Sequence, residues 1–340
     1  MFASLLVVAL IGAIAWAGSA IGLSYLFGVV LPYVAVVTFF LGVIWRMVYW
    51  AKSPVPFSIP TTGGQEKSLD FIKHEKWDCP NTKFGVVVRM FLEVCFFRSL
   101  FRNTAADVRE FDPVTKGPRT IYYSSKWLWF FALLFHYCFL LVFIRHFRFF
   151  MDPVPGWLTF MESIDGIMQI GAPRFFWTGG LLLVAVLFLL ARRLFNQRLR
   201  YISLMNDYFP LFLILGVVLS GICMRYFDKT DIAQVKVFIM GLVHFSPVAP
   251  DGISPLFFMH LAFVSVLLLY FPFSKLMHMP GVFFSPTRHL PTNTREVRHV
   301  NPWNPPKQYF TYAEYEDVYR DAMAKAGLPL EKQPSSKAAE

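Results

Sequence analysis

Four histidines lie within or at the ends of long apolar stretches, where an ionisable side chain is costly and is therefore a candidate for function. They are His136 and His146, ten residues apart, and His260 and His278, eighteen residues apart. Two neutral imidazoles from facing helices can occupy both axial positions of a haem iron. One such histidine could simply be hydrogen-bonded between helices. Two on each of two segments predict two b-type haems, with all four side chains as iron ligands.

The other histidines and the cysteines give no sign of a further metal site. His74, His289 and His299 lie in polar stretches and are expected at the surface, whereas His244 follows a short apolar stretch that could form a surface helix. The four cysteines are scattered and contain no C-x-x-C pair. This spacing excludes a self-contained iron–sulfur cluster or a cysteine-based zinc site.

The composition indicates that the elements carrying these histidines lie in lipid. Of the 340 residues, 56% are hydrophobic and 16% are charged, and residues 1–45 carry no charge. A helix needs roughly 20 mainly apolar residues to cross a bilayer, and only helices and closed barrels satisfy their backbone there. We therefore predict an all-α integral membrane protein with about six transmembrane helices and a four-helix dihaem-binding bundle, the apolar segments being 3–18, 25–46, 127–149, 175–191, 208–224 and 255–278.

The segments divide the chain into four regions. We expect two N-terminal transmembrane helices (1–49), a cytoplasmic loop (50–126), the four-helix dihaem core (127–280) and a cytoplasmic tail (281–340). In the loop, Gly85–Asn103 is apolar with charges spaced along it, which is typical of an amphipathic helix in the interface or against a partner. The tail is expected to be extended through Pro306 and to form a short helix near 311–326.

The basic residues give the orientation. Of the 32 Lys and Arg, 26 lie in the loops 46–126, 192–207 and 275–340, which by the positive-inside rule face the cytoplasm. The multi-pass chain is thus expected in the cytoplasmic (inner) membrane, with the large loops and the C-terminus inside. Topology explains the net charge of +10, so no nucleic-acid partner is needed.

This orientation pairs His146 with His260 near the outer surface, and His136 with His278 near the inner surface. The helical rise gives ~15 Å for ten residues but ~27 Å for eighteen. The inner pair therefore requires helix tilt, side-chain reach or a bend at Pro272 to remove the difference.

Charged residues at the outer end suggest contacts for cofactor and substrate. Arg145, Arg148 and Arg225 are placed to bind the propionates of an outer haem, although interfacial arginines also snorkel without binding anything. A haem with two protein ligands has no open site and can only transfer electrons, and the two-electron partner within lipid is a quinol. Its polar contacts would come from Arg148, Glu162, Asp165, Arg174 and Lys229, of which Arg148, Arg174 and Lys229 are the candidate quinone residues.

The spacing of the four histidines resembles that of the nitrate reductase gamma-subunit family of dihaem cytochromes b, over about residues 127–280. The stretches Ile59–Lys73 (IPTTGGQEKSLDFIK) and Arg89–Thr104 (RMFLEVCFFRSLFRNT) resemble the cytoplasmic loop of the DsrM family, the membrane cytochromes b of the DsrMKJOP complexes of dissimilatory sulfur metabolism. This resemblance implies menaquinone exchange near the outer haem. It also implies electron exchange with a cytoplasmic iron–sulfur subunit of the DsrK type, alongside the other DsrMKJOP subunits.

Two alternatives remain open on the sequence. The chain could be the membrane anchor of a nitrate reductase, a hydrogenase or a heterodisulfide reductase. It could also be a haem-free scaffold or a transporter, but transporters often contain internal repeats and the sequence shows none.

Overall fold

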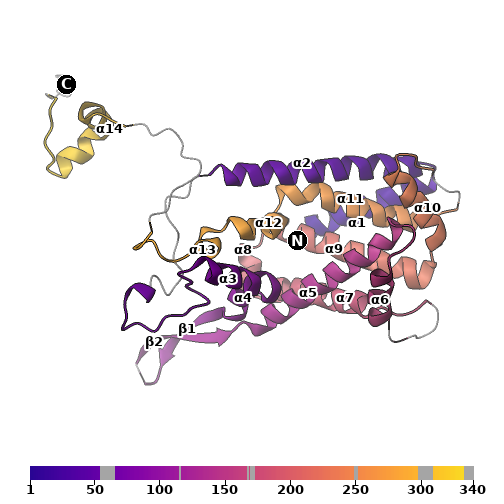
Figure 1. Ribbon diagram of the computed structural model, residues 1–340, viewed down its shortest axis with the longest axis horizontal. Coiled ribbons are helices and arrows are strands. Elements are labelled where there is room, and N and C mark those ends of the chain that lie inside the picture. The colour runs from indigo at the N-terminus through magenta and orange to yellow at the C-terminus, as the bar shows by residue number, and fades with distance from the viewer. Residues whose placement is uncertain are drawn as a thin grey trace.

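The structure, a computed structural model, describes residues 1–53, 66–114, 116–166, 168, 173–248, 252–297 and 309–332. Six of its helices are long and apolar enough to cross a membrane, and they lie side by side (Figure 1). These spans are Phe2–Ala20, Leu26–Ala51, Lys126–Phe149, Trp177–Phe195, Met205–Asp228 and Pro255–Phe273. The prediction of an all-α membrane protein with six transmembrane helices is confirmed.

The first two helices lie against the last one. Helix α1 (Phe2–Ala20) ends in a turn where Gly22 adopts a φ of +100°, a conformation that glycine tolerates best. A π turn at Leu26–Val30 leads into α2 (Leu31–Ala51). Both α1 and α2 pack against α11 (Pro255–Tyr270).

The remaining spans form a row in which each helix packs on the next. Helix α5 (Lys126–Arg145) packs on α7 (Trp177–Phe195), α7 packs on α9 (Met205–Cys223), and α9 packs on α11. Buried apolar side chains join them, including a cluster of Cys138, Leu182, Val186, Ile214 and Val218. Helix α5, which carries His136 and ends just before His146, and helix α11, which carries His260, are not a closely packed pair.

The last span is shorter than the predicted segment 255–278, because the helix breaks near Pro272. Helix α11 ends at Tyr270, a 3-10 turn covers Phe271–Phe273, and Ser274 is extended (φ −117°, ψ 178°). A second turn (Lys275–Met277) leads to α12 (His278–Gly281). Proline lacks an N–H and so cannot continue the helical ladder. The predicted bend at Pro272 is confirmed.

One end of the bundle carries most of the extramembrane structure, and we call it the hairpin end (Figure 1). It contains α3 (Lys83–Phe96), α4 (Arg98–Phe101), the strands β1 (Thr104–Asp112) and β2 (Gly117–Ser124), and the short helices α8 (Gln197–Ile202) and α13 (Pro286–His289). The strands pair antiparallel, with Thr104 opposite Ser124. The predicted amphipathic helix within 85–103 is present, but it breaks at Phe97, and the hairpin was not predicted.

The opposite end, which we call the far end, carries α6 (Gly156–Asp165) and α10 (Ile232–Val243). Helix α10 is apolar but too short to span a bilayer, as expected for the stretch before His244.

The C-terminal segment folds on itself. The predicted tail helix is present as α14 (Tyr312–Lys325), and Thr311 and Glu314 form a capping box at its start. The carboxylate of Glu316 is fully buried and accepts hydrogen bonds from the backbone N–H groups of Glu331 (2.8 Å) and Lys332 (3.2 Å). Before α14, the chain is not extended throughout as predicted, because α12 and α13 form helical turns. Residues 54–65, which include Ile59–Gln65 of the motif at Ile59–Lys73, residues 298–308 and residues 333–340 lie outside the described parts.

We predict that Glu316→Ala frees the segment that follows α14, because it removes the charged acceptor of two backbone N–H groups, each such hydrogen bond contributing about 1.5–3 kcal/mol. Amide hydrogen exchange at Glu331 and Lys332 should accelerate about tenfold or more. Asp317→Ala is the control, since it removes only a surface ion pair with Lys332. Equal protection in both variants would contradict this role of Glu316.

Candidate functional site

The outer pair of predicted ligands meets near the far end. His146 follows the last residue of α5, His260 lies on α11, and their ring centres are 6.4 Å apart with the planes inclined by 14°. The Nδ1 atom of His146 lies 2.7 Å from the carbonyl oxygen of Val142, and that of His260 lies 2.9 Å from the hydroxyl oxygen of Ser220 on α9. Two histidines 114 residues apart in the sequence therefore face each other.

The inner pair meets toward the hairpin end. His136 on α5 and His278 at the start of α12 have ring centres 6.0 Å apart, with the planes nearly perpendicular at 83°. Their Nδ1 atoms lie 2.7 Å and 2.8 Å from the carbonyl oxygens of Ala132 and Lys275. The break after Tyr270 allows the eighteen residues between His260 and His278 to match the ten between the α5 histidines.

These hydrogen bonds fix the tautomer of every imidazole. A carbonyl oxygen only accepts, so Nδ1 of His136, His146 and His278 carries the proton. The hydroxyl of buried Ser220 donates to the carbonyl of Gly216 at 2.7 Å, so it accepts from Nδ1 of His260. In each ring the Nε2 lone pair is left for another partner, which is how protein scaffolds prepare histidines as metal ligands.

The ring separations fit two axial ligands of one iron. A metal–imidazole nitrogen bond is about 2 Å long and a ring nitrogen lies about 1.1 Å from its ring centre, so two imidazoles on opposite sides of one metal would have centres about 6.2 Å apart. The observed 6.4 Å and 6.0 Å agree with this spacing. Because α5 and α11 are not closely packed, a planar group between the rings is compatible with the helix arrangement. Both sites therefore fit a bis-histidine haem.

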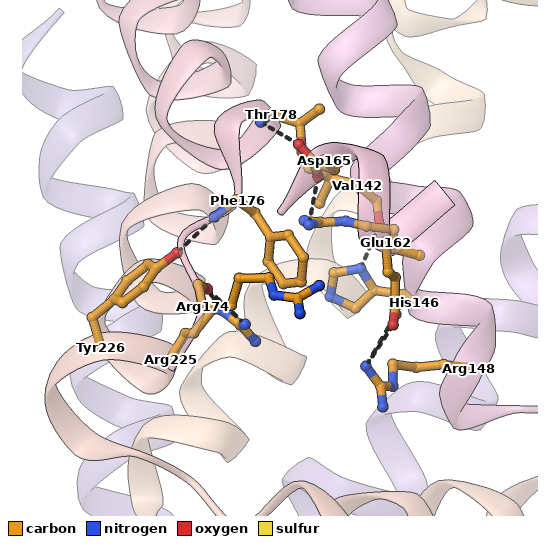
Figure 2. Close-up of polar contacts among 11 residues, drawn as sticks. Val142, His146, Arg148, Glu162, Asp165, Arg174, Phe176, Thr178, Arg225 and Tyr226 are labelled. Carbon is orange, nitrogen blue, oxygen red and sulfur yellow. Dashed lines mark hydrogen bonds and ion pairs between the residues drawn. The ribbon is translucent and has the colours of Figure 1, made fainter. Parts of the chain in front are cut away.

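Two of the predicted cations at the far end, Arg145 and Arg148, have acidic partners within the chain (Figure 2). Arg145 Nη1 lies 2.6 Å from Oδ2 of Asp165, whose carboxylate also accepts hydrogen bonds from the backbone N–H (2.9 Å) and the hydroxyl (2.6 Å) of Thr178. Arg148 donates to both carboxylate oxygens of Glu162 at 3.0 Å. The guanidinium of Arg148 is thus largely used by Glu162, whereas Arg145 keeps a buried Nε without a hydrogen-bond partner.

The ring of Phe176 contacts two of these arginines, Arg145 and Arg225. The ring lies 3.9 Å from the guanidinium carbon of Arg145 and 4.1 Å from that of Arg225, so two positive groups contact one aromatic ring. Arg225 also donates to the carbonyl of Arg174 at 2.8 Å and 3.2 Å. Figure 2 shows His146 beside this group, so a concentrated positive charge borders the outer histidine pair.

A cavity of about 340 Å³ lies between α5, α6 and α7, and Arg145, the residue before His146, is part of its wall. Its size is within the range of small-molecule sites, and its walls are mainly apolar with one carboxylate and one guanidinium. The lining residues are Leu141, Arg145, Met161, Ile164, Asp165, Trp177 and Thr178. None of the three predicted quinone residues, Arg148, Arg174 and Lys229, lines this cavity.

Comparison with known proteins decides the family. The model of the nitrate reductase gamma subunit family matches residues 94–299, more than half of the chain. The chain belongs to this family. The match begins within α3, so α1 and α2 lie outside the part that defines the nitrate reductase gamma subunit family.

Three relatives extend the comparison. The chain is 47% identical over 288 residues to an Hdr-like menaquinol oxidoreductase cytochrome b-like subunit of Archaeoglobus fulgidus, covering 82% of this chain and 84% of that one. It is 41% identical over 282 residues to the subunit of the same description in Archaeoglobus profundus (81% and 82%). It is 28% identical over 176 residues to the respiratory nitrate reductase 1 gamma chain of Escherichia coli (48% and 75%).

The coarse prediction is thereby confirmed: the chain is a membrane cytochrome b subunit of the electron-transfer kind. The narrower resemblance to the DsrM family finds no support among these relatives and stays a prediction.

Sequence reasoning missed three contributors to the site. Ser220 fixes the tautomer of His260, and Phe97 and Phe135 pack perpendicular to His136, with ring centres 4.9 Å and 5.0 Å away. A serine within an apolar span is a signal that could have singled out Ser220. Nothing in the spacing of phenylalanines distinguishes Phe97 from its many neighbours of the same type.

We predict that Asp165→Leu destabilises the protein strongly, because it leaves the buried guanidinium of Arg145 without a counter-charge, a loss of about 3–5 kcal/mol. Thermal unfolding of the detergent-purified protein should shift to a clearly lower temperature. The double variant Arg145→Leu/Asp165→Leu should recover part of the loss. Asp152→Leu, which removes an exposed partner of Lys236, serves as the control and should change little.

Proposed function

We propose that this chain is the dihaem membrane subunit of a respiratory complex and exchanges electrons between menaquinol and an iron–sulfur partner in the cytoplasm. The observation that carries the proposal is that the imidazoles face each other in two pairs, His146 with His260 and His136 with His278. The ring separation in each pair suits two ligands of one iron. In every ring Nδ1 is satisfied by the chain and Nε2 is left for the metal.

When bound, each haem supplies a one-electron centre whose axial positions are both filled by imidazole, so it transfers electrons without binding oxygen. The chain's own residues hold the ligand rings in position and surround them with apolar side chains. At the outer site, Arg145 and Arg225 provide positive charge suited to propionate carboxylates, and Arg145 has a free buried Nε for this purpose. Arg148 is a weaker candidate, because Glu162 already binds it.

The cavity between α5, α6 and α7 is the site that we propose for the quinol ring. Oxidation of menaquinol releases two electrons and two protons, so the site needs an apolar slot beside a haem and a group that can accept a hydrogen bond from the hydroxyl. Asp165 provides such a carboxylate in a wall that is otherwise apolar. Arg148, Arg174 and Lys229 lie on the same end of the chain and would contact the quinol at the entrance.

The proposed partner is an iron–sulfur subunit of the DsrK type, within a complex of dissimilatory sulfur metabolism. We place the hairpin end in the cytoplasm, because it contains the loops that hold the excess of Lys and Arg. The relatives described as Hdr-like menaquinol oxidoreductase subunits match over more of the chain and at higher identity than the nitrate reductase gamma chain does. This difference favours a menaquinol oxidoreductase over a nitrate reductase anchor.

Purification of the native complex tests the choice of partner. Co-purification of an iron–sulfur subunit and the other subunits of a sulfur-metabolism complex would support it, whereas a molybdenum or nickel enzyme would overturn it. A pure, colourless chain that retains its partners would overturn the dihaem proposal itself.

We predict that replacing any one ligand histidine by alanine reduces the haem content from about two per chain to about one. His146→Ala and His260→Ala should remove the same haem, and His136→Ala and His278→Ala the other, as measured by haem quantification and reduced-minus-oxidised spectra. His244→Ala is the matched control, because His244 also bonds a backbone carbonyl through Nδ1 (2.8 Å) at the end of an apolar helix. Loss of haem in that variant, or its retention in all four others, would refute the assignment.

We also predict that Leu141→Trp fills the proposed quinol cavity and slows haem reduction by a menaquinol analogue about tenfold or more. Reduction by dithionite and the haem content should not change, since the substitution touches neither histidine pair. Leu140→Trp changes the neighbouring, exposed position of α5. In this control variant, the menaquinol analogue should reduce the haems at the wild-type rate. Unchanged quinol kinetics in Leu141→Trp would exclude this cavity.

A further inference from the structure

The junction between α3 and α4 is a sharp elbow at the hairpin end. Phe97 adopts a left-handed conformation there (φ 51°, ψ 47°), which is uncommon for a residue with a bulky side chain. Glu93 stabilises the elbow from within: its backbone carbonyl accepts from the N–H of Phe97 (3.1 Å), and its carboxylate accepts from the N–H (2.9 Å) and the hydroxyl (2.6 Å) of Ser99. Arg288 pairs with the same carboxylate at 3.2 Å.

Two side chains of α5 hold this elbow against the span. The indole N–H of Trp129 donates to the carbonyl of Phe96 (2.7 Å), and the hydroxyl of Tyr137 donates to the carbonyl of Cys95 (2.9 Å). These donors lie on either side of His136 along α5. The elbow is therefore fixed over the part of α5 that carries the inner histidine.

The ring of Phe97 consequently meets that histidine directly. Its centre lies 4.9 Å from the centre of the His136 imidazole, with the planes at 87°. The ring centre of Phe135, which precedes His136 on α5, lies 5.0 Å from the same imidazole, with the planes at 88°. Together with the Nδ1 bond to Ala132, these two rings fix the plane of the imidazole. That plane is nearly perpendicular to the ring of His278, whereas the outer pair is nearly parallel.

We propose that Phe97 is a positioning residue that sets the ring plane of His136 and thereby the electronic properties of the inner haem. This inference rests on the proposed dihaem function. The relative orientation of two axial imidazoles determines how the iron d orbitals split, and second-shell contacts tune the potential of the metal. The inner haem is thus tuned by the loop that precedes the dihaem core, and the outer haem is not.

The test compares variants of the full chain, purified with its partners, by electron paramagnetic resonance and redox titration. Phe97→Gly removes the ring and, because glycine accepts a positive φ, leaves the backbone of the elbow unstrained. Phe97→Tyr keeps the ring. Phe91→Ala is the matched control, since it removes an exposed α3 aromatic that packs edge-on against Phe96 and not against His136. The signal of the inner haem is the one that disappears in His278→Ala.

We expect Phe97→Gly to retain about two haems per chain while the low-spin signal and midpoint potential of the inner haem shift and those of the outer haem stay in place. Phe97→Tyr and Phe91→Ala should match the wild type. Should Phe97→Gly fail to assemble, Phe97→Leu answers the same question, because it keeps apolar bulk without a ring. Two haems with both signals unmoved would overturn this inference alone. A wild-type protein without haem would instead overturn the proposed function on which it rests.

Discussion

Within lipid a polar ring nitrogen must find a partner in the protein, and this constraint orders the arrangement of α5 and α11. Each of the four imidazoles satisfies its Nδ1 within the chain, through a backbone carbonyl or, for His260, through Ser220. The nitrogens that remain belong to rings that face each other across two helices that are not closely packed. Helix packing alone would favour closing that space, because contact between apolar surfaces is what stabilises neighbouring helices in a bilayer. This arrangement supports the proposal that a metal with two opposed coordination positions lies between the rings of each pair.

The sequence contained enough information for the spans and for the histidine pairs, and the reason is physical. Apolar length and the cost of an ionisable group in lipid are properties of local sequence, so they identify helices and candidate ligands without a structure. The mismatch between ten and eighteen residues even indicated a bend at Pro272, which the structure contains. The elbow at Phe97, the β1–β2 hairpin and the role of Ser220 depend instead on contacts between segments distant in the chain. No periodicity encodes such contacts.

At the far end, the sequence identified the arginines but did not predict their acidic partners within the chain. The three arginines were expected to bind haem propionates. Arg145 and Arg148 pair with Asp165 and Glu162 of the chain itself, and Arg225 donates to the backbone carbonyl of Arg174. A guanidinium in this setting needs a counter-charge whether or not a cofactor is present, since an unpaired buried charge is very costly. The carboxylates of Asp165 and Glu162 provide part of this counter-charge, so the arginines around Phe176 can lie close together without a bound cofactor.

The two histidine pairs are held by different parts of the structure. A change at the hairpin end would therefore affect the two pairs differently. The outer pair lies on continuous elements: His146 bonds Val142 of its own helix, and His260 bonds Ser220 of the neighbouring span α9. The inner pair depends on a segment after the break at Pro272 and on the α3–α4 elbow, both of which lie outside the packed part of the bundle. Displacement of the hairpin end would therefore change the surroundings of His136 and His278 before it reached His146 and His260. A partner that binds the hairpin end would therefore affect the inner pair first. The outer pair is separated from that end by the length of α5.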